Sequence, residues 1–195
     1  MIRNLLFAIS LTFAFAQIAL ASTLTGQVTG TTGVSVVYLE APAGNTFPAP
    51  TAHVTVSQKS LQFQPHLAVV QSGTTVDFLN SDGVAHNVFW PSFQEKGKKA
   101  PGKNLGTWPQ GETRSYKFDQ PGVAALLCNV HPEMSGYIVV VPTPYFAQTD
   151  VSGNFRIENI PDGQYTVTSW DEGTKPQSRP VTVSGNTTLN LELTK

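Results

Sequence analysis

Short runs in which apolar and polar residues alternate recur along most of the chain, and this feature restricts its fold more than any other. Alternation with a period of two is typical of strands that have one face in a core and the other in solvent. No stretch after residue 21 has the period of an amphipathic helix, so the sequence predicts an all-β protein. We expect strands at residues 23–28, 34–39, 53–58, 61–63, 66–71, 75–80, 86–90, 113–118, 123–127 and 137–141, with more after residue 150.

The first 21 residues have the pattern of a secretory signal peptide. Arg3 gives a positive start, residues 5–20 are mostly apolar and uncharged, and Ala19-Leu20-Ala21 supplies small residues for cleavage after Ala21. An uncleaved membrane anchor is the alternative, although the apolar run is short for a span. We therefore expect a periplasmic or secreted protein. Its mature chain should contain no membrane span, because no later segment is long and apolar enough.

The balance of charged residues excludes one class of partner. The chain has 12 Lys and Arg against 13 Asp and Glu, so no basic excess marks a nucleic-acid-binding protein.

The chain has one cysteine, which cannot form an internal disulfide, so stability must come from apolar cores or from a metal. We expect the mature protein to be a monomer.

That single cysteine stands in the stretch CNVHPEM, residues 128–134. Cys128, His131 and Met134 follow an apolar strand and share one tight loop, which can present all three side chains to one point. A thiolate, two imidazoles and a weak axial thioether are diagnostic of a blue copper site. The best second imidazole is His86, in the stretch FLNSDGVAHNVFW, where Gly83 and Val84 let the chain turn.

Two alternatives to copper stay open at this point. One is a β-sandwich with a buried cysteine, a core methionine and two incidental histidines, since free cysteine is often buried. The other is zinc, which binds Cys and His well, although structural zinc sites seldom include a thioether.

Residues 52–141 resemble the cupredoxins, in particular the plastocyanin and amicyanin branch. The matching motifs are F-x-P at 63–65, G-x-x-V-x-F-x-N at 73–80, D-x-x-x-H-N-V at 82–88, Pro121-Gly122, and C-x-x-H-x-x-M at 128–134. The resemblance implies a Greek-key β-sandwich that holds one type 1 copper ion through His86, Cys128, His131 and Met134. It also implies that Asn87 joins the two ligand loops and donates its backbone N–H toward the Cys128 sulfur.

Both ends of the mature chain resemble a second family, the carboxypeptidase-regulatory-like (transthyretin-like) domains. The motifs are G-x-V at 26–28, D-x-x-G-x-F at 150–155 and P-x-G-x-Y at 161–165. We therefore predict that the cupredoxin domain, 52–141, is inserted into a small β-sandwich formed by residues 22–50 and 143–195. The alternative is a single larger sandwich with a C-terminal appendage.

The predicted function is the transfer of single electrons between redox partners, without enzymatic catalysis. A transient protein partner should dock near His131, on an apolar rim of Val84, Pro132 and Met134. The alternative is a copper-binding or trafficking module of the cell envelope with no role in electron transfer. A domain of a copper reductase or oxidase would need further histidine clusters, and the chain has only 4 histidines.

Overall fold

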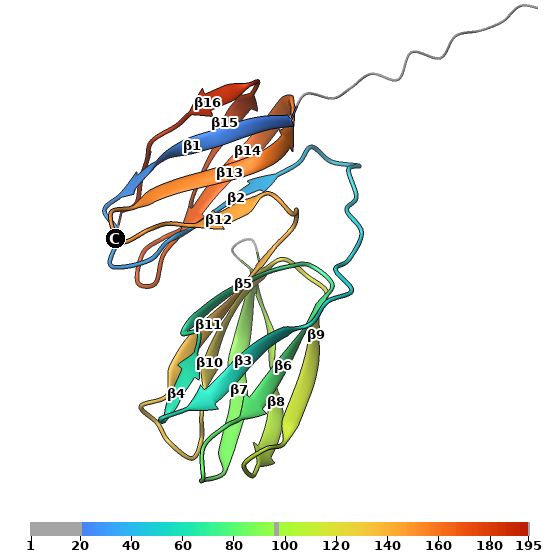
Figure 1. Cartoon of the computed structure of the whole chain (residues 1–195), viewed down its shortest axis with the longest axis vertical. Coiled ribbons are helices and arrows are strands. Elements are labelled where there is room, and N and C mark those ends of the chain that lie inside the picture. Colours follow the sequence, from blue (N-terminus) through green and yellow to red (C-terminus); the bar gives the residue numbers. More distant parts are fainter. Residues whose placement is uncertain (1–20, 96–97, 195) are drawn as a thin grey trace, which may run out of the picture.

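The computed structural model describes residues 21–95 and 98–194, which form two β-sandwiches one above the other (Figure 1). The predicted signal peptide, residues 1–21, lies outside the described residues except for Ala21. All of the assigned elements in the described part are strands, so the prediction of an all-β protein is confirmed there. Within that part, no helix is long and apolar enough to cross a membrane.

The central sandwich is built from residues 54–141. One sheet has the order β5–β11–β10–β7–β8, with β5 (Leu67–Gln71), β11 (Ser135–Val141), β10 (Gly122–Leu127), β7 (His86–Glu95) and β8 (Lys98–Trp108). The other has the order β4–β3–β6–β9, with β4 (Gln62–Gln64), β3 (Val54–Lys59), β6 (Thr74–Asn80) and β9 (Thr113–Phe118). Strict alternation of burial along β6 places Val76 and Phe78 in the core between these sheets.

The outer sandwich combines strands from both ends of the described chain. In one sheet β1 (Ala21–Thr29) lies between β13 (Asn154–Pro161) and β16 (Asn186–Thr188), and also pairs with β17 (Leu191–Glu192). The other has the order β12 (Phe146–Gln148), β2 (Val36–Glu40), β14 (Gly163–Trp170) and β15 (Gln177–Val183). The apolar residues of β1 and β2, including Leu24 and Leu39, share one core with Ile160 and Val167.

Strand β8 departs from what its sequence favours. Its glycines and Pro101 indicate an irregular loop, but residues 98–108 pair with β7 along a long antiparallel hairpin. Strand β8 is at the edge of its sheet, where a proline costs no hydrogen bond on the solvent side. A Cβ at Gly102 would lie 1.8 Å from the carbonyl oxygen of Trp90, so glycine permits this close pairing.

The two sandwiches contact each other along β5 and β11. Trp170 of the outer sandwich packs in one apolar cluster with Val141 of the central one. Glu172, which follows β14, accepts a hydrogen bond from the Tyr137 hydroxyl at 3.0 Å. The same carboxylate lies 2.9 Å from Nε2 of His66.

Candidate metal centre

Three of the four predicted ligands lie together at the end of the central sandwich that points away from the outer one (Figure 1). His86 is the first residue of β7, Cys128 follows β10, and His131 lies in the loop before β11. One ligand atom from each of the three falls within 4.8 Å of the others. The two Nδ1 atoms of His86 and His131 are 3.0 Å apart, and Cys128 Sγ is 4.0 Å from His86 Nδ1.

The chemistry of these donor atoms fits a copper ion. His86 Nε2 is 2.9 Å from the Asp82 carboxylate, so that nitrogen carries the proton and leaves a lone pair on Nδ1. This lone pair faces Cys128 Sγ and the Nδ1 atom of His131. One sulfur and two imidazole nitrogens around a common point are a donor set suited to copper.

The fourth predicted ligand, Met134, is on the same loop, which is closed by a hydrogen bond from its N–H to the carbonyl oxygen of His131 at 3.0 Å. Its side chain is buried in the same core cluster as Cys128. The expectation that Met134 forms part of an exposed rim is therefore wrong, because the thioether points into the protein. Its role as a ligand stays a prediction.

Asn87 connects the strand of His86 to the loop of Cys128. Its backbone N–H donates to Cys128 Sγ at 3.4 Å, and its side-chain Oδ1 accepts from the N–H of Asn129 at 3.3 Å. Its Nδ2 donates to the carbonyl oxygen of Gly106 at 2.7 Å. The expected role of Asn87 in joining the two loops is confirmed, and such contacts fix a ligand's orientation and tune its basicity.

Asp82 is a part of the site to which sequence reasoning assigned no role. Its carboxylate bonds to His86 Nε2 and also accepts the N–H groups of Ser60 and Leu61, at 2.7 and 2.9 Å. Burial raises the pKa of Asp82, but these two N–H groups and the His86 ring outweigh that effect, so the pKa lies below its ordinary value. The carboxylate therefore stays ionised and holds the buried ring of His86 in one orientation. The spacing of four residues between Asp82 and His86 was the only signal in the sequence.

We expect Asp82→Asn to weaken copper binding by about 10- to 100-fold, the usual cost of losing a contact that orients a metal-binding histidine. An amide that turns its NH₂ toward Nε2 favours the wrong tautomer. Competition with a copper chelator measures the change. Asp77→Asn is the matched control, because Asp77 lies 2.9 Å from His53, which is outside the ligand cluster. Equal copper affinity in the two variants would contradict this role.

The remaining histidines, His53 and His66, are exposed and bind carboxylates instead of joining the cluster. Both are therefore surface residues outside the donor cluster.

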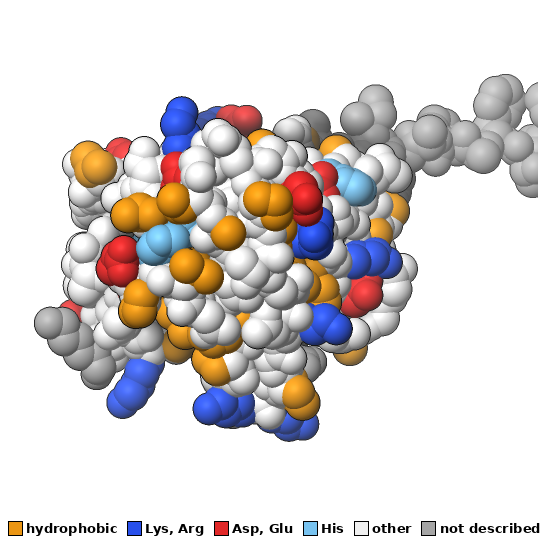
Figure 2. Space-filling model, turned by 90° about the horizontal axis from the view of Figure 1, so that it is seen from below, with side chains coloured by type: hydrophobic (Ala, Val, Ile, Leu, Met, Phe, Trp, Pro, Cys, Tyr) orange, Lys and Arg blue, Asp and Glu red, His pale blue; other side chains and the backbone are white. Residues whose placement is uncertain are grey.

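The surface over the cluster is apolar. His131 is partly exposed, whereas His86 is fully buried. Three large apolar side chains on the adjoining loops, Leu61, Val84 and Val130, are between 41% and 49% exposed. Seen from this end, the molecule shows a histidine with apolar side chains on several sides (Figure 2).

Comparison with known proteins assigns the family. Residues 50–141 match the model of the copper-binding proteins of the plastocyanin/azurin family. Amicyanin-alpha from Methylorubrum extorquens is 30% identical over 138 residues, which cover 71% of this chain and 98% of that protein. This chain belongs to the plastocyanin/azurin family. Copper is its cofactor, and the family carries electrons on that metal, in agreement with both expectations.

The outer sandwich has its own match, because residues 134–194 fit the carboxypeptidase regulatory-like domain. Both predicted resemblances are therefore confirmed.

Several solved structures are similar to about half of this chain. A reduced form of a mutant amicyanin is 20% identical, with a TM-score of 0.41 over 54% of this chain and 98% of that one. A purple cupredoxin from Nitrosopumilus maritimus is 24% identical, with a TM-score of 0.38 over 45% and 99%. A copper-containing nitrite reductase from Thermus scotoductus SA-01 is 24% identical, with a TM-score of 0.42. This match covers 53% of this chain and 25% of the reductase.

Proposed function

We propose that the protein carries single electrons between redox partners, outside the cytoplasm, on one type 1 copper ion held by His86, Cys128, His131 and Met134. The observation that supports this most is the convergence of a thiol and two imidazole nitrogens within 4.8 Å, at the end of a rigid sandwich. Bound copper supplies a one-electron couple. The residues around it hold the donor atoms in place, so a change of charge requires little movement.

Each of the two imidazoles has its own task in this proposal. The ring of His86 is closed off from water and held by Asp82, so it anchors the site. His131 is partly exposed, and its ring offers the shortest route from the donor cluster to the surface. Leu61, Val84 and Val130 around that end form an apolar surface, which suits the small contact area of transient redox complexes.

The division of the chain into two domains and a signal peptide is part of the same proposal. Residues 52–141 form the copper-binding domain of a monomer, and residues 22–50 and 143–195 form the outer domain. Residues 1–21 are the signal peptide that directs the protein to the periplasm or out of the cell.

Voltammetry of the copper-loaded mature protein, repeated in the presence of a Cu(I) chelator, tests the proposal. A carrier should give a reversible one-electron wave and should retain its copper through many cycles. Loss of copper to the chelator on the first reduction would contradict electron transfer. It would instead support the alternative, a copper-trafficking module.

A further inference from the structure

Strand β11 packs against both sandwiches, one with each of its faces. Ile138 and Val140 enter the core that also holds Met134, whereas Val139 and Val141 are buried in the apolar cluster shared with the outer sandwich. Two buried faces are typical of a strand in the interior of a protein and not of one on the outer surface of a sandwich. Because β11 begins directly after Met134, the outer sandwich covers the back of the strand that ends the ligand loop, residues 128–134.

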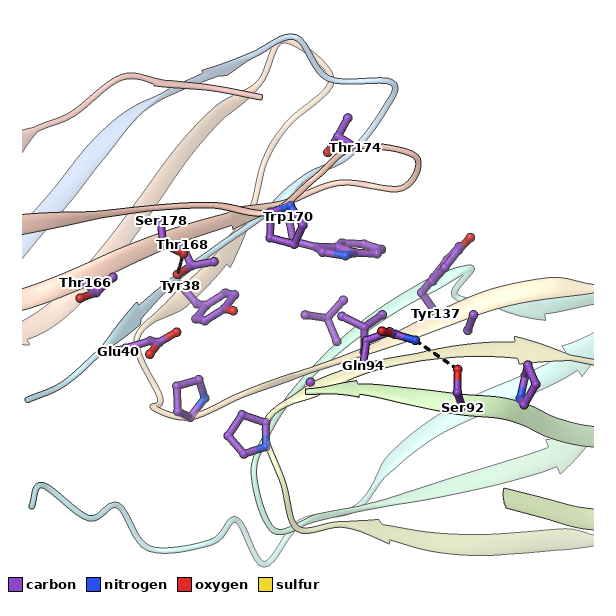
Figure 3. A pocket seen from close by; sticks show the side chains of 18 residues that line it. Tyr38, Glu40, Ser92, Gln94, Tyr137, Thr166, Thr168, Trp170, Thr174 and Ser178 are labelled. Carbon is purple, nitrogen blue, oxygen red and sulfur yellow. Dashed lines mark hydrogen bonds between the residues drawn. The ribbon is translucent and has the colours of Figure 1, made fainter. Parts of the chain in front are cut away.

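The outer sandwich meets β11 with residues whose positions are fixed. Trp170 is 8% exposed, and the centre of its ring lies 5.3 Å from that of Tyr137 (Figure 3). The next residue, Asp171, is buried, and its carboxylate accepts a hydrogen bond from the Ser35 hydroxyl at 2.9 Å. The backbone that leads into Glu172 is therefore held firmly on the outer sandwich.

From this position Glu172 is connected to the first residue of β11. Its carboxylate accepts a hydrogen bond from the Tyr137 hydroxyl at 3.0 Å and lies 2.9 Å from Nε2 of His66. The other ring nitrogen of His66, Nδ1, lies 3.1 Å from the carbonyl oxygen of Ser135. When the ring carries both protons, it donates to the carboxylate and to this carbonyl group at once. The Tyr137 N–H donates in turn to the carbonyl oxygen of His66 at 2.7 Å.

We propose that Glu172 and His66 are positioning residues for the copper site, and that they hold the Met134 end of the ligand loop through the Ser135 carbonyl group. Ser135 follows Met134 directly, and the Met134 N–H donates to the carbonyl oxygen of His131 at 3.0 Å. A shift of Ser135 therefore moves the thioether and disturbs the bond that closes the loop. This inference rests on the proposed function, and it gives the outer sandwich a part in setting the reduction potential.

Loss of these contacts should raise the reduction potential. A donor atom stabilises Cu(II) more than Cu(I), because the attraction grows with the charge of the ion. A thioether that is held less firmly at Met134 therefore favours Cu(I). The side chains of His66 and Glu172 are about half exposed, and an exposed ion pair changes an equilibrium by up to about fivefold. We therefore expect the contacts to adjust the site and not to decide whether it forms.

Two simpler explanations of the contact predict other results. If Glu172 only joins the two sandwiches, its loss lowers stability and leaves the ligand loop and the potential unchanged. If its negative charge acts on the copper through space, only a variant that changes the charge alters the potential. Glu172→Asp distinguishes these explanations, because the shorter side chain keeps the charge but withdraws it from His66 and Tyr137.

Amide hydrogen exchange of the metal-free mature protein tests the positioning without copper. The Met134 amide should exchange about two- to fivefold faster in Glu172→Asp and in His66→Asn than in the wild type. Voltammetry of the copper-loaded variants should show a potential raised by about 20–40 mV, which is a two- to fivefold change in relative affinity at 59 mV per tenfold. The double variant should shift the potential no further than His66→Asn alone, because both residues act through one chain of contacts.

Glu158→Asp is the matched control. Glu158 is a similarly exposed carboxylate of the outer sandwich, paired with Arg156, so its exchange rates and potential should equal those of the wild type. The inference is overturned if Glu172→Asp behaves like Glu158→Asp in amide exchange or in potential. A wild type without a one-electron wave would overturn the proposed function instead. The exchange rates would then still decide whether the outer sandwich positions the ligand loop.

Discussion

Replacing Cys128 with serine should abolish the blue colour of the copper-loaded protein. The colour of such a site comes from charge transfer between a cysteine thiolate and Cu(II), and Cys128 is the only cysteine in the chain. A serine hydroxyl resists deprotonation and is a poor donor to a soft metal. The change removes the absorption band completely and also lowers copper affinity, because two imidazoles remain where three strong donors had been.

The fold should survive this substitution. Cys128 is buried in the core cluster, but serine is similar in size, and its hydroxyl would stand where the sulfur accepts the Asn87 N–H. Circular dichroism should therefore show an intact β-sandwich. Its melting temperature should fall by about 1–12 °C, since single substitutions typically cost about 0.5–3 kcal/mol and each kcal/mol lowers the melting temperature of a chain of this size by about 2–4 °C.

Two histidine variants make the test specific to the cluster. His53→Asn should keep the full absorption, because His53 bonds to Asp77 outside the cluster, whereas His86→Asn should lose it. Visible spectra of the copper-loaded wild type and the three variants give the answer. A colourless wild type, or a strongly blue Cys128→Ser, would show that the thiolate is not a copper ligand.

The sequence predicted the donor cluster well because two of its members are close in the chain and the third stands in a recognisable motif. Cys128 and His131 share one short loop, and His86 stands in the motif D-x-x-x-H-N-V, which resembles the cupredoxins. Asp82 was harder to recognise, because its carboxylate is fixed by the N–H groups of Ser60 and Leu61, both of which have a positive φ. A turn of that kind, more than twenty residues away, leaves no pattern near Asp82.

The strands were predictable where buried and exposed residues alternate along the sequence. They were not predictable where only pairing with a neighbouring strand holds a segment in an extended conformation. Strand β6 alternates strictly, and its sequence predicts a strand. Strand β8 is mostly exposed and contains Pro101, so only its partner β7 holds it in a strand. A groove between the two sandwiches (Figure 3) combines residues of β2, β14, β7 and β11, and no local pattern could bring these together.

Residues 143–195 on their own should be unfolded, although they contain most strands of the outer sandwich. Strand β1 lies between β13 and β16, and β2 lies between β12 and β14, so their removal leaves both sheets divided. It also removes four buried aliphatic side chains from the core, namely Leu24, Val28, Val37 and Leu39. Their burial contributes about 6–12 kcal/mol, at about 1.5–3 kcal/mol for each side chain. That is comparable to the whole stability of an ordinary domain, about 5–15 kcal/mol.

Excision of the central sandwich should restore the fold. The chain leaves the outer sandwich after Glu40 and re-enters at Thr143, and these points lie side by side. The Thr143 hydroxyl donates to the carbonyl oxygen of Leu39 at 2.6 Å, and the Leu39 N–H donates to the carbonyl oxygen of Tyr145 at 2.9 Å. A short Gly-Ser linker from Glu40 to Thr143 should therefore close the outer sandwich without strain, because flexible loops close at little entropic cost.

Heteronuclear NMR spectra distinguish the linked outer sandwich from residues 143–195 alone. The linked form should give dispersed amide signals, and residues 143–195 alone should give the narrow spectrum of an unfolded chain. Dispersed signals from residues 143–195 alone would show that the C-terminal strands form a domain without β1 and β2. The predicted insertion of the copper-binding domain into an outer one would then be wrong.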